Sequence, residues 1–291
     1  MSTALDSRSS KRGRSADYEF SAVIHFPQSL RSVVSSVLDV DREMMIQVCD
    51  GTQRAHKGFT GLVIEAMDAR HVCMVIAYIA ASVEIQPDTD PVRLQLLITT
   101  QTVNTCLKST TPTQTLTLGR LAGEVDLQMA MSEVDPNRAS TVYSLKTLNR
   151  TSDALNLEAM KFDYLVEFEM GAFRPVIKAA RELHAEAVRL RVLDGGDNGP
   201  ASFVMSFQGD ADAEHVFDTV SRLPDGQIVD SLVGGFDESY ASEYLHTFLK
   251  CLENKSTVSI RLAQGLPLIM SYTLGDTGCS MNFVLDRHAR S

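Results

Sequence analysis

The sequence predicts an α+β fold of two similar domains, each with two helices packed on antiparallel β-sheets. Short runs of alternating apolar residues, separated by Gly, Asp, Asn and Pro, recur along most of the 291 residues and are typical of strands joined by turns. Four segments have apolar residues at helical spacing. The order strand, helix, strands occurs around Leu30 and again around Phe173, and a helix followed by a strand pair recurs near Lys108 and Lys250. Since the chain is also longer than one hydrophobic core usually organises, we expect two domains.

The four expected helices each place basic residues away from an apolar face. In the segment 171–188, the apolar face begins at Phe173, and Arg174, Lys178 and Arg181 follow one another at i, i+4 and i+7 on another side. We call these three residues the basic stripe. The other three segments and their basic residues are 29–40 with Arg31, 100–109 with Lys108, and 242–254 with Lys250, where Tyr244 is expected on the buried face.

Most of the remaining segments are expected to be strands, because apolar and polar residues alternate in them and β-branched residues are frequent. The segment 83–93 is expected to be a loop. The expected strands are 44–48, 61–67, 71–79, 115–119, 124–131, 141–148, 163–170, 187–193, 202–209, 256–262 and 267–274.

The chain divides into four regions. Residues 1–17 are Ser-rich and basic and are expected to form a disordered tail, in which KRGR is a nuclear-import signal, a weak nucleic-acid patch or a stretch without a role. The two domains are expected at 18–149 and 164–291, with a connector at 150–163 between them.

Composition and charge narrow the class of protein. Apolar residues make up 44% and charged residues 22% of the chain, which is ordinary for a globular protein. The formal net charge of -10 disfavours nucleic-acid binding unless the basic residues gather on one face. Five separated cysteines without a CxxC pair favour a reducing compartment, and the longest apolar stretch is too short to cross a bilayer, so we expect a soluble intracellular protein with no membrane partner.

The polar cluster at residues 68–73 raises the question of catalysis or metal binding. Asp68, His71 and Cys73 lie between two strand-like runs, but a zinc site needs three or four ligands and a catalytic cysteine needs a base. The glycine-containing loops lack the spacing of nucleotide-binding motifs. We therefore expect no catalytic residues, no metal and no cofactor, and interpret the cluster as a turn; an enzyme built on His71 and Cys73 is the weakest alternative.

The segment 61–79, GLVIEAMDARHVCMVIAYI, closely resembles a strand-turn-strand of the proliferating cell nuclear antigen (PCNA) family of DNA sliding clamps. The segments 29–38, 164–188 and 244–285 are similar to other parts of these clamps, so the resemblance covers roughly residues 18–287. It implies two DNA-clamp domains per chain and a ring of three subunits around duplex DNA, with helices lining the hole. It also implies a non-enzymatic processivity factor that tethers a DNA polymerase and acts in the nucleus or in a viral replication compartment. Whether a clamp loader is needed is left open.

The resemblance assigns two kinds of site. The basic positions of the family that face the central hole of the ring correspond here to Arg31, Lys108, Lys178 and Lys250. Arg174 and Arg181 lie on the same basic stripe as Lys178. Ser32 and Thr105 stand where the family often has lysine, which implies sparser DNA contact. A second site is a hydrophobic pocket that accepts partner peptides carrying paired aromatic residues. The residues implied for it are Met67, His71, Val72, Met74, Leu155, Leu157, Pro267, Phe283 and Val284.

Several alternatives remain open at the level of sequence. The ring is a homotrimer, or the chain is one subunit of a heterotrimeric checkpoint clamp, or it is a monomeric or dimeric processivity factor of viral type. Candidate edge strands for subunit contact are 141–148 and 214–221. Glu158, Leu285 and Asp286 depart from the family pattern near the pocket, so the partner motif is left open.

Overall fold

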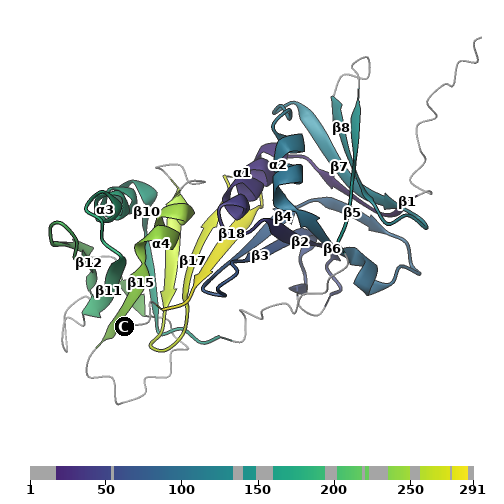
Figure 1. Ribbon diagram of the computed structural model, residues 1–291. Coiled ribbons are helices and arrows are strands. Elements are labelled where there is room, and N and C mark those ends of the chain that lie inside the picture. Colours follow the sequence, from purple (N-terminus) through teal and green to yellow (C-terminus); the bar gives the residue numbers. More distant parts are fainter. Residues whose placement is uncertain are drawn as a thin grey trace, which may run out of the picture.

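The computed structural model describes residues 18–53, 56–133, 140–148, 160–193, 202–217, 220–222, 235–249, 256–275 and 277–287. These residues form an α+β structure in which helices lie along one side of antiparallel sheets (Figure 1). The predicted fold class is therefore confirmed. The basic tail 1–17 and most of the predicted connector lie outside the described residues.

The four predicted helices are present. Within the described residues, they are α1 (Pro27–Leu38), α2 (Thr100–Leu107), α3 (Met170–Glu182) and α4 (Ser242–Phe248). α1 packs against α2, and α3 packs against α4. α3 ends earlier than predicted because His184 has a positive φ of 56° and β11 begins at Ala187. No helix in the described part of the chain is long and apolar enough to span a membrane.

The described strands form three sheets whose paired strands are antiparallel, and each half of the chain contributes one of the smaller sheets. The first half forms a five-stranded sheet, in the order β5 (Ser82–Ile85), β1 (Tyr18–Ile24), β7 (Gln114–Leu121), β8 (Leu127–Glu133) and β9 (Thr141–Leu145). The second half forms a four-stranded sheet, in the order β13 (Ala213–Phe217), β12 (Ser202–Phe207), β11 (Ala187–Leu193) and β15 (Phe236–Ala241).

The third sheet joins the two halves. Its strand order is β14 (Val220–Arg222), β10 (Tyr164–Glu169), β16 (Thr257–Leu262), β17 (Leu268–Thr273), β18 (Ser280–Leu285), β4 (Cys73–Ala80), β3 (Thr60–Met67), β2 (Glu43–Asp50) and β6 (Gln95–Thr99). The junction is the pairing of β18 with β4, in which Phe283 lies opposite Val75 and Val284 opposite Met74. The last described strand is thus hydrogen-bonded to the first half of the chain.

One predicted loop is wrong in part. Residues 83–93 begin within β5, which pairs with β1, and end in a 3₁₀ turn, η3 (Pro91–Leu94). The short alternation of Val83 and Ile85 with polar residues allows this strand, since both apolar side chains pack against the main core. The two strands proposed as subunit edges, β9 and β13, do lie at the edges of their sheets.

Candidate functional site

The turn between β3 and β4 is organised by one carboxylate. Asp68 Oδ1 accepts hydrogen bonds from the backbone N–H groups of Val72 and Cys73, each over 2.7 Å, and Oδ2 accepts one from the N–H of Arg70 over 3.3 Å. These bonds hold the backbone around His71, which has a positive φ of 58°. The polar cluster is therefore a turn, as predicted.

The cysteine of this turn is poorly suited to nucleophilic chemistry. Burial, assisted by the negative charge of Asp68, raises the pKa of the Cys73 thiol to about 12, so the reactive thiolate is scarce at neutral pH. Among the described residues, no group of three or more His, Cys, Asp or Glu side chains is arranged to hold a metal ion. The geometry here stabilises a turn.

The same carboxylate connects the turn to helix α4. The Tyr244 hydroxyl donates to Asp68 Oδ2 over 2.7 Å and accepts from Arg70 Nη2 over 2.6 Å. Arg70 Nη2 also pairs with Glu243 Oε1 over 2.6 Å. Tyr244 was expected on the buried face of its helix; it is half-buried instead, because its hydroxyl reaches out to these polar partners.

A second, smaller apolar cluster lies on the face of the nine-stranded sheet that does not pack in the main core. Strand alternation explains this, because Val75 of β4 packs in the main core while Met74 and Ile76 point to the other face. Register places Met67, Met74, Val284 and Ile269 side by side on four successive strands. We call this set, with the residues packed against it, the outer cluster. Its members are Cys49, Val63, Met74, Ile76, Phe162, Ala263, Ile269 and Val284, with Phe59, Met67, Tyr78, Met160 and Leu266 partly buried against them.

The outer cluster brings together only part of the predicted peptide pocket. Met67, Met74 and Val284 lie in it, and Met67 Sδ is 2.8 Å from Nδ1 of the exposed His71. Pro267 is half-buried next to Leu266, and Val72 packs against the main core. Leu155 and Leu157 lie outside the described residues.

The assignment of Phe283 to the pocket is wrong. Phe283 is fully buried in the main core, where its ring meets that of Phe248 edge-on with centroids 4.8 Å apart. It precedes Val284 on β18, so the two side chains point to opposite faces of the sheet. Ile269, Ala263 and Phe162, which the sequence reasoning did not include, lie in the cluster.

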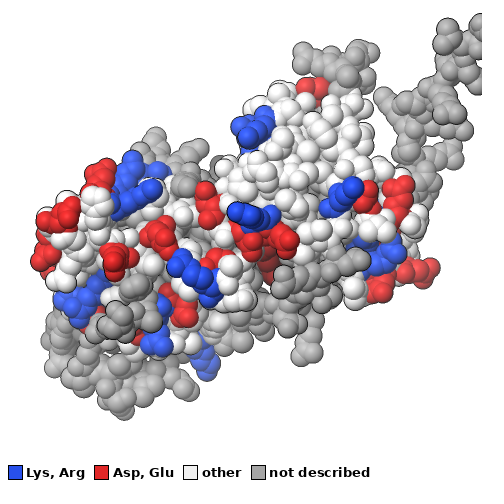
Figure 2. All heavy atoms as spheres, in the orientation of Figure 1, with Lys and Arg blue, Asp and Glu red and all other residues white. Residues whose placement is uncertain are grey.

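The predicted DNA-contacting residues are carried by the helices. Lys178 and Arg181 of the basic stripe are exposed on α3, and Arg174 is half-buried beside them. Arg31 is half-buried on α1, and Lys108 is exposed at the end of α2. Lys250 lies outside the described residues. In Figure 2, the surface over α1 and α2 is largely uncharged, whereas basic and acidic side chains gather around α3. Of the four described helices, α3 carries the most basic residues.

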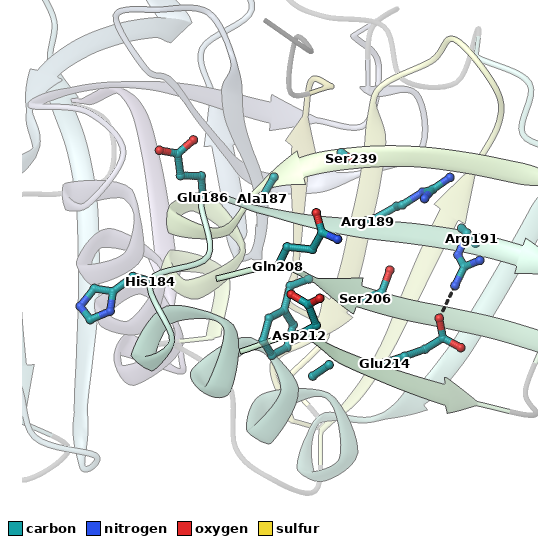
Figure 3. A pocket seen from close by; sticks show the side chains of 12 residues that line it. His184, Glu186, Ala187, Arg189, Arg191, Ser206, Gln208, Asp212, Glu214 and Ser239 are labelled. Atoms are coloured by element: carbon teal, nitrogen blue, oxygen red, sulfur yellow. Dashed lines mark hydrogen bonds and ion pairs between the residues drawn. The ribbon is translucent and has the colours of Figure 1, made fainter. Parts of the chain in front are cut away.

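A shallow hollow of about 900 Å³ lies on the four-stranded sheet (Figure 3). Two arginines on β11 line it, and both are already paired: Arg191 with Glu214 of β13, and Arg189 with Asp237 of β15. His184 pairs with Asp210 at 2.8 Å beside it. The three basic side chains named here are thus all paired with carboxylates.

Comparison with known proteins supports the fold assignment. No protein-family model matches the chain, and no curated protein matches it in sequence. Many solved structures match the chain, and three PCNA structures among them cover 92–93% of it. The PCNA of Thermococcus kodakaraensis is 16% identical, with a TM-score of 0.71 over 92% of this chain and 100% of that one. The PCNA of Entamoeba histolytica is 16% identical, with a TM-score of 0.71 over 93% and 99%. The PCNA2–PCNA3 complex of Sulfolobus tokodaii contains a chain that is 13% identical, with a TM-score of 0.68 over 93% and 100%. This chain therefore has the fold of the PCNA sliding clamps.

Proposed function

We propose that this protein is a DNA sliding clamp, a non-enzymatic processivity factor that holds a polymerase on duplex DNA. The observation that carries the proposal is the match of 92% of the chain, both halves included, to a complete clamp subunit. Two further features support it. Basic residues are carried on the helix side of an acidic protein, and an apolar cluster lies on the opposite face of the sheet that joins the two halves.

The ring would close by pairing of edge strands. β9 and β13 end their sheets at opposite parts of the chain, and each exposes an apolar side chain, Val142 and Val216, both 59% accessible. An unpaired strand edge with outward apolar residues is a template for another strand. Contact of β9 with β13 of the next copy is heterologous, and three such contacts would give a homotrimer.

DNA would pass along the helix side. Lys178, Arg181, Lys108 and Arg31 would make phosphate contacts that do not depend on sequence and that weaken with salt. The outer cluster would receive peptides from DNA polymerase and from other replication and repair proteins, and methionines suit a surface that accepts different partners. A clamp loader would open the ring, and the site of action would be the nucleus or a viral replication compartment.

The deciding experiment is absolute mass by light scattering across a hundredfold range of protein concentration. A species of three times the 32.0 kDa chain mass supports the homotrimer. Val142→Asp should then reduce the mass to one chain, whereas Val125→Asp, a matched change at an exposed valine outside the two edge strands, should not. If the ring forms, the protein should remain on circular DNA and slide off the linear form.

A heteromeric clamp is the second candidate, favoured by the match to a subunit of a PCNA2–PCNA3 complex. It predicts a single-chain mass at all concentrations and recovery of the trimer mass when two other subunits are added. A chain that stays single and still holds linear and circular DNA equally would instead indicate a processivity factor that does not encircle DNA.

A further inference from the structure

An acidic side chain is buried beside the outer cluster. Glu65 lies on β3 two residues before Met67, so both side chains point to the same face of the sheet. Only 6% of Glu65 is accessible to solvent. Its cross-strand neighbours are Met45 of β2 and Ile76 of β4, whose side chains offer no hydrogen-bond donor. The carboxyl group is thus placed among apolar side chains.

One oxygen of this carboxyl group is without a hydrogen bond from the part of the chain that the structure describes. This oxygen is Glu65 Oε1, which is buried. Burial raises the pKa of Glu65, which reflects the cost of a charge without compensation. The Cys49 thiol, a member of the outer cluster, has its pKa raised to about 12 by burial and then by the charges of Asp50 and Glu65. Register also places Glu65 directly opposite Ile76, a member of the outer cluster.

Glu65 belongs to a row of side chains that runs beside the apolar anchors. Register places Glu65, Ile76, Asn282 and Ser271 on four successive strands, next to the row of Met67, Met74, Val284 and Ile269. Ser271 Oγ is also buried without a hydrogen bond in the described part of the chain. An extended peptide lying over the apolar row would have polar groups on one side that can accept its hydrogen bonds.

We propose that Glu65 determines which peptides bind the outer cluster, by accepting a hydrogen bond from a Lys or Arg side chain next to the peptide's apolar anchors. This inference rests on the proposed docking function. A cationic donor would give a charge-assisted hydrogen bond and remove the cost of the buried oxygen, whereas an acidic residue there would be repelled. Met67, half-buried beside Glu65 and flexible, is the side chain that moves to admit the donor.

The test is peptide selection on the full-length protein. A displayed library would carry paired aromatic residues at fixed positions and random residues around them, and would be selected on the wild type, Glu65→Leu, Glu65→Gln and the control Glu167→Leu. Glu167 is an exposed acid on β10 of the same sheet. The wild type and the control should enrich Lys or Arg at one flanking position about tenfold, and Glu65→Leu should lose this preference while retaining the aromatic pair.

The outcomes separate this inference from the docking function. If the wild type enriches paired aromatics without a basic preference, or Glu65→Leu keeps the same preference, the role of Glu65 is wrong and docking stands. If the wild type enriches no peptide, docking fails and this inference with it. Glu65→Gln keeps the shape and an acceptor but loses the charge, so a weakened basic preference in this variant supports the inference even if Glu65→Leu does not fold.

Discussion

The hydroxyl of Tyr244 donates a hydrogen bond of 2.7 Å to the carboxylate of Asp68, across 176 positions of sequence. The bond ties the turn after β3 to helix α4, so one contact links the two halves of the chain. The same turn leads into Met74 and presents His71 and Met67 at the border of the outer cluster. The shape of the proposed docking surface therefore depends on a helix from the other half.

Removing the Tyr244 hydroxyl should destabilise the fold. Tyr244→Phe leaves Asp68, which is buried, with one donor fewer, and the expected loss in the free energy of unfolding is about 1–3 kcal/mol. Tyr240→Phe is the matched control, because the Tyr240 hydroxyl is buried without a hydrogen bond in the described residues and burial raises its pKa. This control should be neutral or stabilising. If urea unfolding showed the same loss of free energy in Tyr244→Phe and Tyr240→Phe, the hydrogen bond from Tyr244 to Asp68 would not be what stabilises the fold.

The Asp68 carboxylate should make stability depend on pH. Burial by itself raises the pKa of Asp68, but hydrogen bonds from the Cys73 amide, the Tyr244 hydroxyl and the Val72 and Arg70 amides outweigh it, so the pKa lies below its ordinary value of 3.8. The folded state therefore favours the ionised form. Its contribution to stability is complete above the unfolded pKa and disappears as the pH falls through the folded pKa.

Asp68→Asn isolates this contribution. The wild type should be the more stable protein at pH 7, and the difference in free energy of unfolding should shrink as the pH falls below about 4. Chemical unfolding of the wild type and of Asp68→Asn at several pH values from 7 to 3 measures this difference. A difference that stays constant over this range would show that the ionised carboxylate is not what holds the turn.

Sequence alone predicted the parts of the fold that depend on local pattern. Alternation and helical spacing located the four helices and most strands, and the segment around Met67 predicted the turn. Phe283 was assigned to the pocket together with Val284, but neighbouring residues of a strand point to opposite faces. Phe283 shares its face with Met281 and Leu285 in the main core, and Val284 shares the other face with Ser280 and Asn282. The bond between Asp68 and Tyr244 could not be predicted, since it depends on how two distant elements pack. Glu65 looks like an exposed strand residue in sequence, and its burial depends on neighbouring strands.

Gly61 should tolerate no side chain. It has φ of +147°, and a Cβ atom there would lie 2.2 Å from the backbone oxygen of Ile79 on β4. Gly61→Ala should therefore separate β3 from β4 and cost roughly 3 kcal/mol or more, from overpacking added to backbone strain. Gly123→Ala is the control, because φ is +83° but no atom lies within 4 Å of the added carbon. The midpoint temperature of thermal unfolding should be well below that of Gly123→Ala in the Gly61→Ala variant. Equal midpoints would contradict the close approach of Gly61 to the Ile79 backbone.

The buried ion pair between Glu19 and Arg120 in the first half should contribute more to the free energy of unfolding than the exposed pair in the second half, between Asp237 and Arg189. Glu19 and Arg120 are both buried, and Glu19 accepts from Arg120 Nε over 2.9 Å and pairs with Arg93 Nε over 2.6 Å. Arg120→Met leaves the buried carboxylate of Glu19 with Arg93 as its remaining partner and should cost about 1.5–3 kcal/mol, as for a lost hydrogen bond to a charged group. Arg189→Met removes a partly exposed partner of Asp237 and should cost about 0–1 kcal/mol. Similar losses in urea unfolding would contradict this ranking.

The basic stripe should carry the DNA affinity of the helix side. The double variant Lys178→Ala, Arg181→Ala should weaken binding to any duplex and reduce the slope of log affinity against log salt by about 2, one for each lost phosphate contact. The control double variant changes Lys57 and Lys161, two exposed lysines next to members of the outer cluster, Phe59 and Phe162. This control variant loses the same number of positive charges. It should leave the slope of log affinity against log salt unchanged, because the outer cluster lies on the face of the sheet opposite the main core and the helices. Fluorescence anisotropy of a labelled duplex across a salt series measures both. Equal loss in the two variants would mean that DNA responds to total charge, in which case the helix side is not the DNA-binding surface.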